Sequence, residues 1–254
     1  MLPGITRRAA MVFVLAVGVL AGLPGQSAES LLEQAENSLY PDNFYMRMRI
    51  VTERPDRRNT DMVFEVYYKD AVGTFIEIQE PSRSRGIRFL SKEENLWLYN
   101  PRSNSRRAIR LSPRDSFQGT LFSNHDIGDP QYTDDYQARR LSDETIEHPE
   151  LGSVETQVIE ATPTSDEAPY GRIVMWLRQA DAVPLQMEYY ARSGLLFKRM
   201  YLSDIRELAG AERPAIMRME SMQLENAFSE IRILALEERN DLSDRRFTEA
   251  NLTR

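Results

Sequence analysis

The chain has 254 residues, of which 41% are hydrophobic and 28% charged, and its formal net charge is −7. This length can bury a full core, and the acidic balance argues against a general nucleic-acid-binding protein, which normally carries a basic surface. The sequence has no cysteine, which excludes disulfides, thiol catalysis, thiolate metal sites and lipid attachment to an N-terminal cysteine.

Residues 1–28 have the layout of a secretory signal peptide, which we expect to be cleaved. Arg7 and Arg8 precede an uncharged apolar run from Ala9 to Leu23. That run is shorter than the roughly 20 residues that a membrane-spanning helix needs. The paired arginines leave both the general secretory route and the twin-arginine route open. The sequence therefore predicts an exported protein, with residues 29–254 as its mature domain.

A single amphipathic helix is predicted directly after the signal peptide, from Ser30 to Pro41. Ser30 is expected to cap it, with Glu33 completing a capping box, and Pro41 is expected to end it. One face at helical spacing is apolar and consists of Leu31, Leu32, Ala35 and Leu39.

From residue 43 the hydrophobic period changes to two, which is typical of strands. Short strands joined by turns predict an antiparallel meander. The predicted strands are 43–51, 61–69, 74–79, three between 85 and 109, 136–141, 154–161, 171–178, 184–191, 195–203, 215–224 and 230–238. A sheet of this many strands is expected to curl toward a barrel. Residues 242–252 predict a short C-terminal helix capped by Ser243.

Residues 112–130 interrupt the strand pattern. Turn-forming residues there alternate with apolar ones, which predicts short helices or an ordered loop. We take Phe117, Leu121 and Phe122 as candidates for a lid over the sheet.

Several predicted strands are apolar on both faces. Leu96 and Leu98 point to one side of the sheet, while Trp97 and Tyr99 point to the other. An antiparallel sheet that faces water should have one polar face, so a helix, another chain or a ligand must cover the second one. Many of the eleven methionines lie on strands and would give an adaptable apolar lining. This pattern fits a core packed under helices, and it also fits a groove that accepts acyl chains.

No motif for catalysis, phosphate binding or metal binding is present. His125 and His148 lie far apart in turn-like stretches, and Asp134 and Asp135 fit a solvated turn. An acid pair of the glycosidase kind has no distinctive candidate among the many carboxylates. We therefore expect neither an enzyme nor a cofactor or metal.

Arginines are concentrated on one hairpin and its flanks. They could contact anionic lipid headgroups or an acidic partner protein. The alternative is a set of solvated turns whose arginine stems cover apolar surface. The residues proposed for this contact are Arg102, Arg106, Arg107 and Arg110.

The stretch "RGIRFLSKEENLWLYNPRSNSRRAIRLSPRDSFQG", residues 85–119, resembles the outer-membrane lipoprotein-sorting proteins of the LolA-like family. The shared features are Gly86 before a strand, the "NLWLYNP" strand from Asn95 to Pro101, an arginine-rich hairpin, and a Ser-Phe-x-Gly element at Ser116–Gly119. The order of elements also agrees over nearly the whole mature chain. The sequence departs from the family in one respect. Family members commonly have an aspartate soon after this element, whereas here Thr120-Leu121-Phe122 follows it and the next aspartate is Asp126. We therefore assign no ligand-gating residue to this segment from the resemblance.

The resemblance implies a mainly antiparallel β (α+β) domain, a curved and incomplete barrel. An N-terminal helix and short helices would cover its concave apolar face. It also implies a periplasmic carrier of acyl chains, from lipid or lipoprotein, that supports transport to the outer membrane as a monomer. The alternative is an accessory of an RND-type exporter that carries no lipid. Alternation cannot decide which face of residues 96–99 lines the groove, and we choose the aromatic pair. The predicted groove residues are Phe64, Val66, Tyr68, Ile76, Ile78, Trp97, Tyr99, Ile173, Met175, Met187 and Tyr189.

Overall fold

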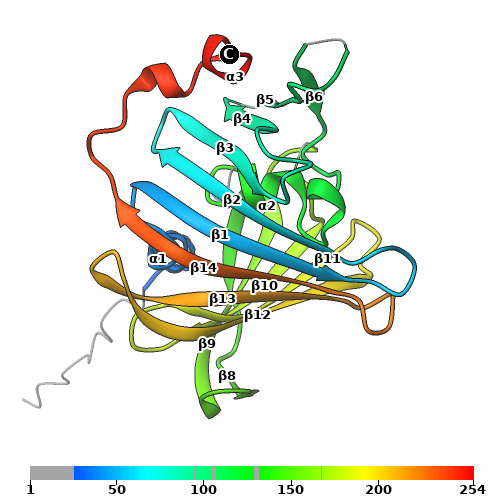
Figure 1. Ribbon diagram of the computed structural model, residues 1–254. Helices are drawn as coiled ribbons and strands as arrows, with labels where there is room; N and C mark the ends of the chain where they lie inside the picture. The colour runs from blue at the N-terminus through cyan, green and yellow to red at the C-terminus, as the bar shows by residue number, and fades with distance from the viewer. Residues whose placement is uncertain (1–25, 94, 105–106, 129–131, 167) are drawn as a thin grey trace, which may run out of the picture.

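The computed structural model (Figure 1) describes residues 26–254 except residues 94, 105–106, 129–131 and 167. Most of the predicted signal peptide therefore lies outside the described residues. No helix in the described part of the chain is long and apolar enough to cross a membrane.

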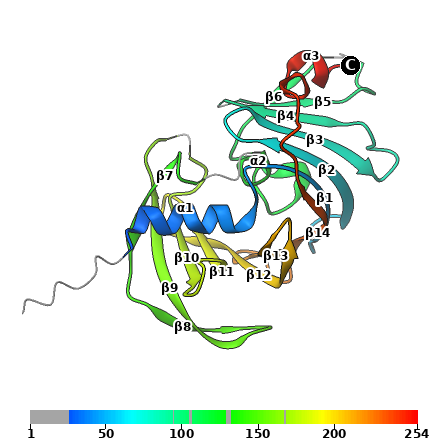
Figure 2. The same ribbon diagram turned by 90° about the vertical axis from the view of Figure 1, so that its left-hand side faces the viewer.

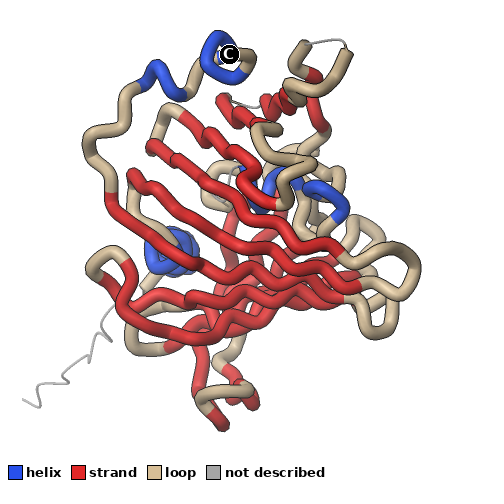
Figure 3. Tube along the Cα trace, viewed as in Figure 1, coloured by secondary structure: helices blue, strands red, loops and turns tan. Residues whose placement is uncertain are grey.

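Strands account for most of the described chain, as Figure 3 shows. The strands are β1 (Asn43–Glu53), β2 (Thr60–Lys69), β3 (Gly73–Glu80), β4 (Arg88–Lys92), β5 (Asn95–Tyr99), β6 (Ile109–Leu111), β7 (Tyr136–Arg140), β8 (Glu144–His148), β9 (Gly152–Pro163), β10 (Arg172–Arg178), β11 (Pro184–Tyr190), β12 (Leu196–Leu208), β13 (Ala211–Ser221) and β14 (Phe228–Glu238). The helices are α1 (Ala28–Leu39), α2 (Asn124–Gly128) and α3 (Glu249–Leu252), with 3₁₀ turns η1 (Phe117–Gly119) and η2 (Asp244–Arg246).

All the described strands belong to one antiparallel sheet that does not close. Its order is β6-β5-β4-β3-β2-β1-β14-β13-β12-β11-β10-β9-β7, and β8 also pairs with β9. The pairing of β1 with β14 joins two meanders, one from each half of the chain. The prediction of a curved, incomplete antiparallel barrel is confirmed.

Irregular pairing contributes to the curvature of the sheet. The register shifts between Arg47 and Met48 on β1, and there are further shifts on β2, β10 and β11. Such bulges bend a strand and increase its twist. The alternating residues of β1 then project into the concave side, and Met48 and Ile50 are almost fully buried there.

Helix α1 covers part of the concave side (Figure 2), where it packs against β7, β9 and β13. Its buried face is the predicted one: Leu31, Leu32, Ala35 and Leu39. The predicted cap was wrong, because the helix begins at Ala28 and its N-cap is Ser27, whose side chain accepts a hydrogen bond from the backbone N–H of Ser30. Ser30 instead accepts a hydrogen bond from Gln34.

The C-terminal segment covers the opposite, convex face of β3–β5. Phe247 and Leu252 are fully buried there against Phe75, Leu90 and Tyr99. In Figure 1 this segment runs from the end of β14 across the strand ends to β4. Ser243 is the predicted cap, and its side chain accepts a hydrogen bond from the backbone N–H of Arg245 at the start of η2. The single helix predicted over residues 242–252 is instead two short pieces, η2 and α3, and α3 is capped by Thr248. The second apolar face of the residue 96–99 strand is therefore covered by the chain's own C-terminus.

Candidate functional site

A cavity lies on the concave side, between the sheet, the end of α1 and the segment that contains α2. We call residues 112–128 the lid segment. Leu39 and Tyr40 line the cavity from the α1 side, and Phe122 and Ile127 line it from the lid segment. Its volume is about 50 Å³, whereas pockets for small ligands span roughly 300–1,000 Å³. The covering elements therefore have to move before a chain-like ligand can enter.

Methionines from strands form much of the cavity wall. They are Met46, Met48, Met187, Met200, Met217 and Met219. Methionine side chains are unbranched and polarizable, so they fill irregular gaps and repack around different shapes. The wall is thus suited to an apolar guest of variable shape.

Nine of the eleven predicted groove residues lie in the buried cluster on the concave side. Four of these, Val66, Tyr68, Met187 and Tyr189, line the cavity itself. The other five support the wall from within the same cluster: Phe64, Ile76, Ile78, Ile173 and Met175.

Trp97 and Tyr99 do not line the groove, contrary to the prediction. The structure places them on the convex face, in the cluster covered by the C-terminal segment. On the concave side their places are taken by Leu96, which is buried, and Leu98, which is partly buried. The two aromatic residues are therefore not groove residues.

The three lid candidates all pack into the concave cluster. The ring of Phe117 contacts Phe64 and Phe89, with centroid distances of 5.4 and 4.9 Å. Phe122 lines the cavity, and the backbone N–H of Leu121 donates to Ser229 Oγ on β14 at 2.9 Å. The lid segment is thus held by both aromatic packing and a buried hydrogen bond.

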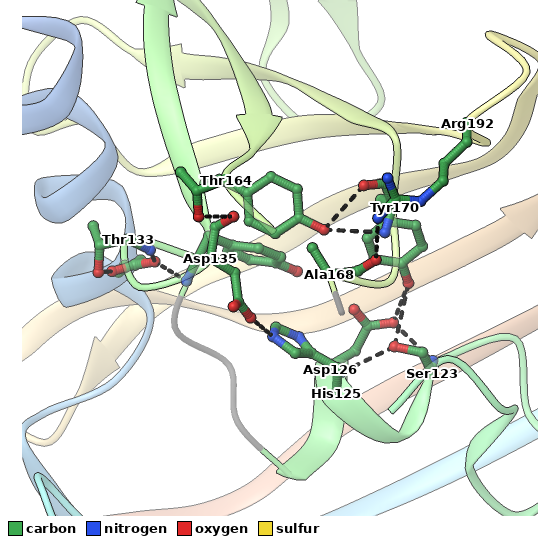
Figure 4. Close-up of polar contacts among 12 residues, drawn as sticks. Ser123, His125, Asp126, Thr133, Asp135, Thr164, Ala168, Tyr170 and Arg192 are labelled. Atoms are coloured by element: carbon green, nitrogen blue, oxygen red, sulfur yellow. Dashed lines mark hydrogen bonds and ion pairs between the residues drawn. The ribbon is translucent and has the colours of Figure 1, made fainter. Parts of the chain in front are cut away.

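A polar cluster that the sequence did not reveal lies within this apolar site (Figure 4). Asp126 Oδ2 accepts hydrogen bonds from the Tyr170 hydroxyl at 2.5 Å and from the Ser123 backbone N–H at 2.7 Å. The Lys198 ammonium lies 3.4 Å from the same tyrosine oxygen. Burial raises the pKa of Tyr170 well above its usual value, and the charge of Asp126 raises it further. The cluster joins the lid segment to β12 and to the turn before β10.

Tyr170 is positioned by a close approach of two backbone segments. A side chain at the next residue, Gly171, would place its Cβ 2.6 Å from the Cα of Arg192, so glycine is required there. The Tyr136 hydroxyl accepts a hydrogen bond from the Tyr170 backbone N–H at 3.0 Å. The phenol ring of Tyr170 also packs against Tyr189, with a centroid distance of 4.6 Å.

Glu36 connects α1 to the residues that follow the lid segment. Its carboxylate accepts hydrogen bonds from the backbone N–H groups of Tyr132 and Thr133 and from the Thr133 hydroxyl. Burial raises the pKa of Glu36, although these three hydrogen bonds act in the opposite direction. On the same side, His125 Nε2 lies 2.9 Å from Asp135 Oδ2. Both covering elements are therefore anchored by polar contacts as well as by packing.

The four arginines predicted to contact a headgroup or a partner differ in their surroundings. The Arg102 guanidinium donates to the backbone carbonyls of Arg85 and Ser82. Arg107 and Arg110 are exposed, and Arg106 lies outside the described residues.

The described residues contain no group of three or more His, Asp or Glu side chains placed to hold a metal ion. His148 serves the local structure, because its Nδ1 accepts from two backbone N–H groups and its Nε2 lies 2.9 Å from the Leu202 carbonyl.

Comparison with known proteins connects this architecture to a family. A family model described as "Uncharacterized protein" matches residues 70–254. No curated protein matches the chain. A LolA superfamily protein from Nitrosomonas europaea is 28% identical with a TM-score of 0.79, over 89% of this chain and 99% of that one.

Two further solved structures share the fold. An outer membrane lipoprotein-sorting protein domain from Vibrio parahaemolyticus is 20% identical, with a TM-score of 0.74 over 89% of this chain and 98% of its own. A DUF1329 family protein from Desulfovibrio piger is 21% identical, with a TM-score of 0.76 over 89% of this chain and 97% of its own. The resemblance seen in residues 85–119 is thus confirmed over most of the chain. The chain belongs to the family whose model matches residues 70–254, and its fold is that of the LolA superfamily.

Proposed function

We propose that the protein is a periplasmic carrier that holds the acyl chain of a lipid or lipid-modified protein and supports its transport to the outer membrane. The observation that carries this proposal is the methionine-rich cavity on the concave side, closed by α1 and the lid segment. The LolA-like fold supports a carrier-type role. The layout of residues 1–28 supports export.

Binding would replace part of the protein's own cover with the guest chain. Burying an acyl chain is worth roughly 0.8 kcal/mol per CH₂ group. A chain of moderate length would therefore offset the loss of packing where one end of α1 or the lid segment swings away. Leu39 and Phe122 contribute to the wall from these two elements and would be among the first side chains displaced.

The direct test is to purify the mature protein from bacterial periplasm without detergent. Its N-terminus is confirmed, and an organic extract is then analysed by mass spectrometry. We expect a lipid or an acylated protein in stoichiometric amount. An empty protein that also fails to bind added fluorescent acyl probes would contradict the proposal. An RND-type exporter as partner and a monomeric state stay predictions from the resemblance; size-exclusion chromatography with light scattering tests the second.

A further inference from the structure

The cavity wall is apolar except for a few side chains, and two of these have a buried oxygen without a hydrogen bond. Asp126 Oδ1 and Thr74 Oγ1 make no hydrogen bond to any residue that the structure describes. Both residues line the same cavity. Helix α2, which carries Asp126, packs against β3, which carries Thr74. Buried polar atoms are almost always paired, so two unpaired oxygens in one apolar cavity need an explanation.

The carboxylate of Asp126 is held in a fixed orientation. Its Oδ2 accepts from the Ser123 N–H and from the Tyr170 hydroxyl, as described above. The backbone N–H of Asp126 donates in turn to Ser123 Oγ at 3.1 Å. These contacts use one carboxylate oxygen and leave the other for whatever enters the cavity. An acceptor left unpaired in a buried site is costly, and a ligand that donates to it recovers that cost.

The nearby cation, Lys198, does not change the preference of the site for a hydrogen-bond donor. Lys198 lies behind Tyr170, with its Nζ 3.4 Å from the phenol oxygen, and it is not part of the cavity wall. Burial lowers the pKa of Lys198, while the charge of Asp126 partly opposes that shift. Three other hydroxyls in the wall are engaged. Those of Tyr132 and Tyr189 lie within hydrogen-bond distance of each other at 3.3 Å, and the Tyr40 hydroxyl donates to Met217 Sδ at 3.4 Å. Among the described wall residues, Asp126 Oδ1 is therefore an unpaired acceptor that an entering polar head group can bind.

We infer that the guest of this cavity is an amphiphile whose polar end is an O–H or N–H donor, such as a hydroxyl or an amide, which binds Asp126 Oδ1. Thr74 Oγ1 would hydrogen-bond the same head group. An ionised fatty acid would be rejected, because its carboxylate would face that of Asp126. This inference rests on the proposed function and adds the class of cargo to it.

The wild-type protein can be tested with matched probes that compete against a fluorescent acyl probe. Dodecanol is compared with its methyl ether, and lauramide with methyl laurate, so that each pair differs mainly in the donor. We expect dodecanol and lauramide to bind at least about tenfold more tightly than their partners, and laurate to bind most weakly. Equal affinities within both pairs, or tightest binding by laurate, would overturn the inference.

For the variant Asp126→Asn, the inference predicts that the order of probe affinities changes in favour of laurate. The two donors at Oδ2 require an oxygen at that position, so the amide nitrogen must take the place of Oδ1 and present N–H donors to the cavity. Laurate should then gain about tenfold in affinity, and lauramide should lose its advantage over methyl laurate. The matched control is Asp61→Asn, the same change at a surface carboxylate that pairs with Arg49 at 2.8 Å and does not line the cavity. It should keep the wild-type order.

Failure of this inference is distinguishable from failure of the proposed function. If no probe binds the folded wild-type protein, the carrier proposal fails and the head-group inference fails with it. If all probes bind with the same affinity, the carrier proposal stands and only the head-group inference fails. The wild-type series decides this even if Asp126→Asn does not fold, which circular dichroism would show.

Discussion

The hydroxyl of Tyr170 donates a 2.5 Å hydrogen bond to Oδ2 of Asp126 across 44 positions of sequence. One residue belongs to the short helix of the lid segment, and the other precedes β10 in the second meander. The bond therefore fastens the lid segment to the second meander.

Tyr170→Phe should weaken this fastening while keeping the ring contact with Tyr189. Hydrogen bonds to charged groups contribute about 1.5–3 kcal/mol, so the free energy of unfolding should fall by about that amount. Urea denaturation measures the change. Tyr201→Phe is the control, because the Tyr201 hydroxyl has only a 3.5 Å contact with Arg199. An equal loss in both variants would contradict the role given to Tyr170.

Val66→Phe should fill the cavity and block the guest. Val66 is 2% exposed and lines the wall, so the added ring has to occupy the space of the ligand. We expect acyl-probe affinity to fall at least about tenfold, with an overpacking cost of about 1–3 kcal/mol. Fluorescence titration and urea denaturation measure the two effects.

The matched control for this variant is Val158→Phe. Val158 is fully buried in a separate small cluster with Val174 and Trp176, away from the cavity. It should have a similar cost in stability and leave probe binding unchanged. Loss of binding in both variants would mean that general destabilisation, and not occupation of the cavity, causes the effect.

The stability of the protein should depend on pH through Glu36, which links α1 to Tyr132 and Thr133. Burial raises the pKa of Glu36 above its ordinary value of 4.5, so the folded state binds this proton more tightly than the unfolded state does. The free energy of unfolding should therefore fall as pH rises from the ordinary carboxyl pKa through the raised one, and this contribution should level off on either side. Glu36→Gln removes it. Urea denaturation across pH tests this, and a difference between the two proteins that does not vary with pH would count against it.

Phe247→Ala should expose the convex face of β3–β5. The side chain of Phe247 is fully buried against strands that are far away in sequence. Removing a buried phenylalanine costs about 3–5 kcal/mol, which urea denaturation measures. Leu234→Ala is a useful comparison, since Leu234 is 51% exposed and its loss should be close to neutral. A small effect at Phe247 would show that the C-terminal segment is not needed to cover the sheet.

Most of the strands were predictable because their alternation is local, although β8 (Glu144–His148) was not predicted. Met48 and Ile50 face inward on β1, as period two requires. The face of the residue 96–99 strand was not predictable, because both of its faces are apolar. What distinguishes them is the C-terminal segment, which brings Phe247 into the same cluster as Trp97 only in the folded chain.

The polar cluster was missed for a similar reason. Asp126 lies in a segment of turn-forming and apolar residues that predicts short helices or an ordered loop, and Tyr170 follows a turn-forming proline. Nothing local links the two residues. A carboxylate between the apolar residues Phe122 and Ile127 is the one available signal, since an acidic residue drawn into a core needs a partner there.

The pairing of β1 with β14 has a consequence for how the protein acquires its structure. Phe44 lies opposite Glu238, so this contact spans most of the chain, whereas most other strand pairs are local hairpins. Closing so distant a contact has a large entropic cost and slows folding. Until the last strand arrives, β1 presents a bare row of backbone donors and acceptors to any neighbouring chain. Strand β14, the last strand along the described chain, thus decides whether a newly made molecule completes its own sheet or aggregates with another.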